Sequence, residues 1–297
     1  MCALKAVDVF MPRSAEVNPV LYIPRPELET ELKEALSETQ HILIHGESGN
    51  GKSWLYKRVF RDEKVFHVVV NLVQASRLGS LNAAFRDVLE RLEGGSVEQR
   101  EIIKTAKLSP YNIGFEGAEK QVVRLGQKEP YEALLNWVSR KSAKRHVIIL
   151  DNFEQISGNS ALCKEVSDCV ILLDDPTYSK YNVKLCIVGV PRDIDDILAA
   201  HGNVATVSSR LREISEVERM TNREAELLMQ IGLERLLKIE IQFDKDDFYK
   251  KVLWLQIELH LSYRSLGFVW HEKLNAISKN LDRCSGNALL SFGQKGL

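Results

Sequence analysis

The chain has few cysteines, and their spacing is typical of neither a metal site nor a disulfide framework. Cys2, Cys163, Cys169, Cys186 and Cys284 are odd in number and widely scattered, whereas metal and redox motifs usually place two cysteines two residues apart. We therefore expect free thiols, most of them buried. The seven histidines lack the HExxH spacing of a zinc hydrolase. A metal site made only of protein ligands is not expected.

The sequence also lacks long apolar runs and an excess of charge of one sign. Nowhere do about 18 apolar residues follow one another, and no basic region precedes an apolar stretch at the N-terminus, so we expect a cytosolic protein without a membrane partner. The 40 Lys and Arg residues nearly cancel the 41 Asp and Glu residues, which leaves a net charge of −1. No whole-chain field therefore attracts nucleic acid.

Four short runs rich in valine and isoleucine predict the strands of a parallel sheet. They cover residues 41–46, 65–73, 145–153 and 183–191. None alternates between apolar and polar residues, which is typical of strands covered on both faces, and helical stretches separate them. The expected fold class is therefore α/β.

The rest of the chain divides into an arm, an insertion and a helical region. Residues 1–20 carry two prolines and suit an extended arm, and residues 21–220 form the expected core. Within the core, residues 96–130 have mixed polarity and predict an inserted loop or hairpin, or an element that contacts a partner. After Met220 the pattern turns helical, so we expect a small helical domain over 221–297, with the boundary near 218–221.

The strongest motif follows the first expected strand. It reads GESGNGKS and fits G-x-x-x-x-G-K-[ST] at every fixed position, between an apolar strand and an amphipathic segment. Its glycines let the backbone wrap a phosphate, and the start of the next helix attracts the negative charge. Lys52 is expected to reach the outer phosphates of ATP, and Ser53 to bind Mg2+. The expected nucleotide-binding residues are Gly46, Glu47, Ser48, Gly49, Asn50, Gly51, Lys52, Ser53 and Trp54.

A phosphate loop of this kind works with a second carboxylate, which usually ends a neighbouring apolar strand. The run HVIILD supplies Asp151, and we expect this residue to bind Mg2+ together with Ser53. The alternative is an aspartate that only caps the end of a core strand, since aspartate is common at such ends.

These motifs make residues 20–240 resemble the AAA+ and STAND group of P-loop ATPases. The similarity is greatest to prokaryotic members of the origin-recognition-like branch, many of which look like parts of bacterial defence systems. The resemblance implies a sheet of order 5-1-4-3-2 followed by a helical lid, and adenine contacts from Tyr22, Ile23 and Arg25; ordinary packing is the alternative for these three. The segments that support this resemblance are YIPRPELETEL, VIILDNFEQI, LCIVGVPRDIDDIL and SSRLREISEVERMTNREAELLMQIG.

The residue after Asp151 departs from the family pattern. Many AAA+ proteins have a glutamate there that polarises the attacking water, whereas this chain has Asn152, and Glu154 stands two positions later. Because side chains alternate along a strand, Glu154 turns to the site only if the strand has ended. Glu154 is the candidate general base, and a surface or N-cap carboxylate is the alternative.

The resemblance assigns three further positions. The segment 189–191 reads GVP and replaces the polar sensor that often ends the fourth strand, so that role is absent or lies with Arg192 or Asp193. The alternative for these two residues is a pair at the start of a helix. Arg210 matches the arginine that reaches the γ-phosphate of a neighbouring subunit, with a surface salt bridge as the alternative. Arg264 is the candidate second sensor in the lid, although the usual Gly-x-Pro-Arg pattern is missing.

Three functional interpretations follow. The first is an ATP-hydrolysing switch that forms homo-oligomers and controls an effector protein, in antiviral defence if the resemblance holds. The second is a DNA-loading or transposition-regulator ATPase; KSAKRH and RLRE supply some positive charge, but the acidic residues elsewhere disfavour nucleic acid. The third is a nucleotide-binding scaffold without turnover, which Asn152 and the missing polar sensor keep open.

Overall fold

The computed structural model describes residues 9, 18–94, 129–190, 197, 207–238, 244, 245 and 248. These residues fall into two compact units, one formed by Glu27–Val217 and the other by parts of Met1–Pro26 and Glu218–Leu297. Apart from its last two residues, the expected insertion at 96–130 lies outside the described residues. The domain boundary near 218–221 stays a prediction.

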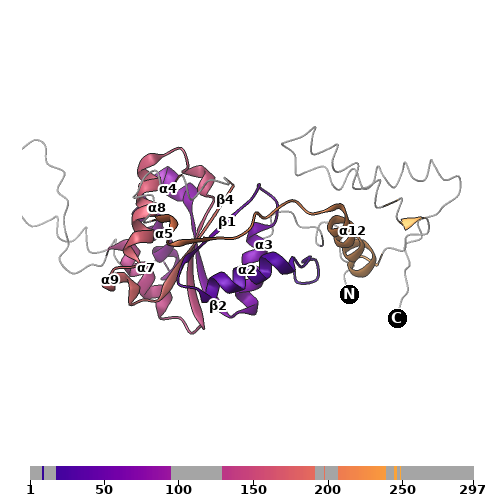
Figure 1. The fold of residues 1–297 in the computed structure, drawn as a ribbon, viewed down its shortest axis with the longest axis horizontal. Coiled ribbons are helices and arrows are strands. Elements are labelled where there is room, and N and C mark those ends of the chain that lie inside the picture. The colour runs from indigo at the N-terminus through magenta and orange to yellow at the C-terminus, as the bar shows by residue number, and fades with distance from the viewer. Residues whose placement is uncertain are drawn as a thin grey trace, which may run out of the picture. The chain divides into compact units, whose positions relative to one another are not determined.

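A parallel sheet of five strands forms the centre of the unit Glu27–Val217 (Figure 1). The strand order is β2-β3-β4-β1-β5, and every pairing between neighbours is parallel. This confirms both the α/β fold class and the order 5-1-4-3-2. The strands are β1 (His41–His45), β2 (Val65–Asn71), β3 (Arg145–Asp151), β4 (Val183–Gly189) and β5 (Leu211–Glu213).

Helices cover both faces of this sheet, as Figure 1 shows. Because neighbouring residues of a strand point to opposite faces, Ile42 and Ile44 of β1 pack with α2 (Pro26–Ser37) and α3 (Lys52–Asp62), whereas Leu43 packs on the other face. Two-sided burial explains why the strand sequences are apolar without alternation. The helices of the second face are α4 (Leu72–Leu78), α5 (Leu81–Leu92), α7 (Pro130–Ser139), α8 (Ser160–Leu172) and the short α9 (Pro176–Ser179).

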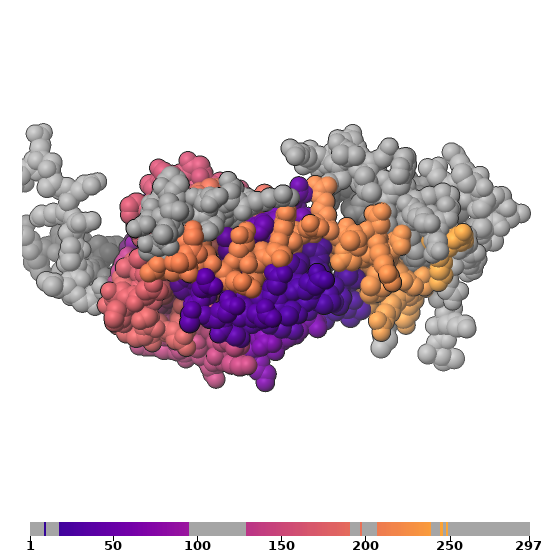
Figure 2. Space-filling model, viewed as in Figure 1, coloured from indigo at the N-terminus to yellow at the C-terminus, as the bar shows by residue number. Residues whose placement is uncertain are grey.

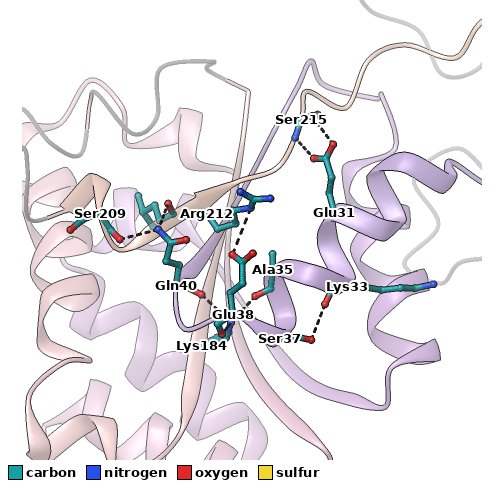
Figure 3. Close-up of polar contacts among 11 residues, drawn as sticks. Glu31, Lys33, Ala35, Ser37, Glu38, Gln40, Lys184, Ser209, Arg212 and Ser215 are labelled. Atoms are coloured by element: carbon teal, nitrogen blue, oxygen red, sulfur yellow. Dashed lines mark hydrogen bonds and ion pairs between the residues drawn. The ribbon is translucent and has the colours of Figure 1, made fainter.

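Lys184 connects the start of β4 to the end of α2 (Figure 3). Its Nζ donates hydrogen bonds to the carbonyl oxygens of Ala35 at 2.6 Å, Glu38 at 2.5 Å and Gln40 at 3.0 Å. The last carbonyls of a helix have no partner within the helix, so a cation is stabilised there. This one side chain therefore ends α2 and fixes the turn into β1.

The short strand β5 is held by side chains from the segment before β1. Gln40 Nε2 donates to the carbonyl oxygen of Ser209 at 2.9 Å, and the Glu31 carboxylate accepts from both the N–H and the hydroxyl of Ser215, each at 2.8 Å (Figure 3). In the space-filling view, orange residues lie against indigo ones, in keeping with the contact between Ser215 and Glu31 (Figure 2). These contacts satisfy backbone groups just before and just after the edge strand.

The second unit contains α12 (Asn222–Gln230), which continues into a π-helical turn over Ile231–Leu236. Thr221 and Glu224 form a capping box at its start: the Thr221 hydroxyl accepts the N–H of Glu224, and the Glu224 carboxylate accepts the N–H of Thr221. The helical pattern predicted after Met220 begins at this cap. Among the helices of the described residues, none combines the length and the apolar character that a membrane crossing needs.

Candidate functional site

The five parallel strands end at one edge of the sheet, and several predicted site residues lie there. The register pairs Asn71 with Asp151 and Asp151 with Val188, which is also paired with Ile44 of β1. One strand therefore separates Asp151 from the strand that leads into the phosphate loop, a spacing of about 10 Å. In open α/β sheets this carboxyl edge is where ligands bind.

Three glycines give the loop after β1 its shape. Gly46, Gly49 and Gly51 have φ angles of 145°, 90° and 92°, in a region that residues with a side chain rarely adopt. A Cβ atom on Gly46 would also overlap the carbonyl oxygen of Val217. The fixed glycines of the motif are therefore required by the backbone path of this chain.

The loop leads into the N-terminus of α3, which is open to an anion. Gly51 is the N-cap and supplies no side-chain acceptor, and the first turn of α3 has no acidic residue. The first N–H groups of a helix have no partner within it, and the helix dipole places partial positive charge there. Trp54 lies in this first turn and is half-buried, while residues 47–49 of the loop are exposed. A phosphate is the ligand that this terminus favours.

Lys52 lies over the loop and close to two carboxylates. Its Nζ donates to the carbonyl oxygens of Gly46 at 2.6 Å and Glu47 at 2.9 Å. Burial lowers the pKa of Lys52, and the negative charges of Glu154 and Asp151 act in the opposite direction. The structure thus brings Lys52, after β1, close to Asp151 at the end of β3 and to Glu154 just after it, although Glu154 lies 102 positions later in the chain.

Asp151 is the last residue of β3 and is partly buried. Burial raises the pKa of its carboxyl group, whereas the N–H of Asn152, which donates to Asp151 Oδ1 at 2.9 Å, lowers it. The nearby charge of Lys52 also favours the ionised form. Carboxylate and hydroxyl oxygens are the hard ligands that Mg2+ prefers, so Asp151 and Ser53 fit this ion chemically.

Tyr56 belongs to the site, and the motif did not reveal it. Its side chain lies one turn after Ser53 on α3 and is 1% exposed. Burial raises the pKa of its hydroxyl and the charge of Asp151 raises it further, while a hydrogen bond with the Ser53 side chain acts in the opposite direction. A tyrosine in an amphipathic helix is usually a core residue, so no sequence signal distinguished this one.

Glu154 reaches the site because the strand ends before it. Asn152 has φ 65° and ψ 49°, a left-handed conformation, and Phe153–Gln155 form a 3-10 turn. The alternation of a strand therefore does not apply to Glu154. Its Oε2 is buried and accepts no hydrogen bond from the described residues, and its charge acts on both Lys52 and Asp151. This position is compatible with the general-base assignment, which stays a prediction.

Three other predicted residues belong to the second unit, and three lie outside the described residues. Tyr22, Ile23 and Arg25 belong to the second unit, in which Arg25 Nη1 donates to the carbonyl oxygen of Glu218 at 2.8 Å and Arg25 Nε lies 3.7 Å from Glu224 Oε1. Their adenine contacts stay a prediction. The candidates Arg192, Asp193 and Arg264 lie outside the described residues.

Arg210 lies at the edge formed by the amino ends of the strands, opposite the carboxyl edge. Leu211, the next residue, is paired with His41 at the start of β1, and the carbonyl of Arg210 accepts the N–H of His41 at 2.8 Å. The five residues of β1 separate it from the phosphate loop, a rise of roughly 15 Å. Its Nε forms an ion pair with Asp174 Oδ2 at 2.5 Å. Arg210 therefore does not serve the phosphate loop of its own chain.

Residues 34–198 match the protein-family model described as AAA domain. This match covers more than half of the chain. The chain belongs to the AAA family. No curated protein sequence matches this AAA protein.

Solved structures include proteins that are similar in fold to this AAA protein. The ADP form of the Aeropyrum pernix ORC2 protein is 16% identical, with a TM-score of 0.51 over 77% of this chain and 56% of its own. Cdc6p from Pyrobaculum aerophilum is 13% identical, with a TM-score of 0.48 over 84% of this chain and 58% of its own. The chain thus spans little more than half the length of these proteins. At such identities the likeness to ORC2 shows a shared fold alone.

Proposed function

We propose that this AAA protein binds ATP with Mg2+ at the loop 46–53 and hydrolyses it. The observation that carries the proposal is the convergence of Lys52, Asp151 and Glu154, whose charges act on one another at the carboxyl edge of the sheet. A phosphate loop alone explains binding, whereas a buried carboxylate oxygen beside it is what hydrolysis needs in addition.

Each residue of the site has a definite chemical task in this proposal. The N–H groups at the start of α3 and Lys52 Nζ, on leaving the carbonyls of Gly46 and Glu47, bind the outer phosphates. Ser53 and Asp151 hold Mg2+, which when bound neutralises charge on the transferred phosphoryl group. Glu154 accepts a proton from the attacking water, and the products are ADP and phosphate.

The biological role in the proposal is an oligomerising switch. Arg210 lies too far from its own loop to act there, so it contributes to hydrolysis only if a second copy of the chain brings its loop to that edge. The residues Tyr22, Ile23 and Arg25 would contact the adenine, and Arg264 would complete the lid. Control of an effector protein in antiviral defence is the output we propose, on the family resemblance of the motifs.

The test measures ATP binding and steady-state hydrolysis for the wild type and two variants. Lys52→Ala should abolish binding, because it removes the cation from the phosphates, whereas the exposed Lys164→Ala is its control. Glu154→Gln should keep ATP affinity and lower kcat at least 100-fold, and Glu90→Gln, an exposed carboxylate on α5, is the control. Unchanged ATP affinity in Lys52→Ala contradicts the assignment of the nucleotide-binding site to this loop. Full activity in Glu154→Gln moves the general base elsewhere, and binding without turnover in the wild type indicates a scaffold.

A matched pair of variants tests the contribution of Arg210. Arg210→Ala and Asp174→Ala both remove the same ion pair, so a purely structural role predicts equal effects on stability and on hydrolysis. A role at a neighbouring subunit predicts that Arg210→Ala alone lowers kcat, by about 10³-fold or more, at protein concentrations where solution mass shows an oligomer. Equal activity of a monomeric preparation and an oligomeric one contradicts the trans contact.

A further inference from the structure

The chain leaves β3 through an unusual corner that lies directly beside the two site carboxylates. Asn152 is one of four non-glycine residues with positive φ among the described residues, and it is the one that follows Asp151. Left-handed conformations cost a residue with a side chain, although asparagine tolerates them better than most. Strain at such a place points to a requirement of the site.

The side chain of Asn152 makes a specific contact across the sheet edge. Its Nδ2 donates to Asn71 Oδ1 at 3.0 Å, and Asn71 is the residue of β2 paired with Asp151. The same Oδ1 accepts the N–H of Val73 at 3.0 Å and so caps α4. The amide pair therefore attaches the corner after β3 to the well-defined start of α4.

The backbone of Asn152 contacts both sides of the corner. Its N–H donates to Asp151 Oδ1 at 2.9 Å, which orients that carboxylate. Its carbonyl oxygen accepts the N–H of Gln155 at 3.0 Å, which closes the 3-10 turn carrying Glu154. Phe153, between them, is fully buried and anchors the turn in the core. One residue thus contacts the Asp151 carboxylate and closes the turn that carries Glu154.

We propose that Asn152, held by Asn71, is the positioning residue that orients the carboxylates of Asp151 and Glu154 toward Lys52. The inference rests on the proposed function for its readout in hydrolysis, but its geometry does not depend on turnover. The left-handed backbone turns the chain so that Glu154 faces the loop, and the amide pair holds that turn. The asparagine that occupies the place of the usual family glutamate therefore has a task of its own.

Backbone and side-chain contributions can be separated by substitution. Asn152→Gly keeps the left-handed conformation and loses the amide, whereas Asn152→Ala loses the amide and disfavours the conformation. Asn71→Ser keeps an N-cap for α4 but is too short to hold Asn152. The matched control is Asn182, which has φ 50° and precedes β4 at the opposite edge of the sheet. Asn182→Gly and Asn182→Ala impose the same backbone change away from the site.

The experiment measures kcat, ATP affinity and the Mg2+ concentration for half-maximal ATP binding. Asn152→Ala should lower kcat about 10- to 100-fold and raise the required Mg2+ about 10-fold, with ATP affinity in the absence of Mg2+ within about twofold of the wild type. Asn152→Gly should recover most of the loss. Asn71→Ser should show a loss similar to that of Asn152→Gly, and the double variant should add little, because both remove one contact.

The outcomes distinguish this inference from the proposed function. Equal losses in Asn152→Ala and Asn182→Ala, or a change in neither kcat nor Mg2+ requirement, overturn the positioning role. If the wild type binds ATP without hydrolysing it, the hydrolytic function fails, while the Mg2+ titration still decides the effect of Asn152 on Asp151. If Glu154→Gln remains active but Asn152→Ala does not, Asn152 does not act through Glu154, and that part of the inference is wrong.

Discussion

Replacing Gly46 with alanine should damage the fold more than the same change at any other loop glycine. The residue has φ 145°, and an added Cβ would overlap Val217 O and lie 3.1 Å from the Val217 carbonyl carbon. Val217 has little freedom to move away. Its N–H donates to His45 O at 2.9 Å, and its carbonyl oxygen accepts Asn50 Nδ2 at 3.0 Å.

Two costs add in Gly46→Ala. The disfavoured backbone conformation costs about 1–3 kcal/mol, and forcing a methyl group into a packed contact costs about 1–3 kcal/mol. The control is Gly79→Ala at the end of α4, where φ is 70° and no atom lies within 4 Å of the added Cβ. That variant bears the backbone cost alone, about 1–2 kcal/mol. We expect Gly46→Ala to lose roughly 2 kcal/mol more free energy of unfolding than the control.

Urea unfolding followed by circular dichroism measures both losses, and ATP titration measures binding by the folded variants. Gly49→Ala and Gly51→Ala extend the series, because both have positive φ and no atom within 4 Å of an added Cβ. They should resemble Gly79→Ala in stability while losing ATP affinity, since they reshape the phosphate loop. If Gly46→Ala unfolds at the same urea concentration as Gly79→Ala, the contact with Val217 has been misjudged.

Two further predictions concern stability at the opposite edge of the sheet. Burial and the charge of Lys184 lower the pKa of His41 to about 4 from 6.5. The unfolded chain therefore takes up the proton at a higher pH than the folded chain does. Up to about 3 kcal/mol of the free energy of unfolding should be lost as the pH falls from 6.5 to 4. His41→Leu should lack this part of the slope in urea unfolding at each pH, and an unchanged slope contradicts the assignment. Lys184→Met leaves three carbonyls without their donor and should lower the free energy of unfolding by about 1–3 kcal/mol. The control Lys164→Met, at an exposed position, should change it by no more than about 0.5 kcal/mol. Equal effects of the two substitutions would refute the helix-capping role of Lys184.

Much of the local geometry of the candidate site could be predicted because its residues follow local rules. The glycines, Lys52 and Ser53 stand at set intervals in one motif, and Asp151 ends a short apolar run that is typical of a buried strand. The sheet order came from the resemblance and is the order observed. Local sequence patterns suffice for a prediction where all the residues that it depends on lie in one segment of the chain.

The remaining parts of the site depend on contacts between distant segments. Whether Glu154 turns to the loop depends on the backbone of Asn152, and that conformation is stabilised by Asn71, 81 positions earlier in the chain. Periodicity showed only that a turn was needed. Tyr56 likewise looks like any buried residue of an amphipathic helix until α3 is placed beside β3. Neither of these two spatial relations can be predicted from a single sequence.

The variable positions of the loop motif carry information of a different kind from its fixed ones. The pattern leaves position 50 open, yet Asn50 is buried and its Nδ2 holds the carbonyl oxygen of Val217. Gly46 is in contact with the same carbonyl group, and the carbonyl oxygen of His45 accepts the N–H of Val217. Lys52 and Ser53 fit the phosphate chemistry that we propose, whereas Asn50 attaches the loop to the backbone at the last residue of the sheet unit. A change in the shape of the loop must therefore be accommodated at Val217, because the loop and Val217 are joined by hydrogen bonds and are packed without space between them.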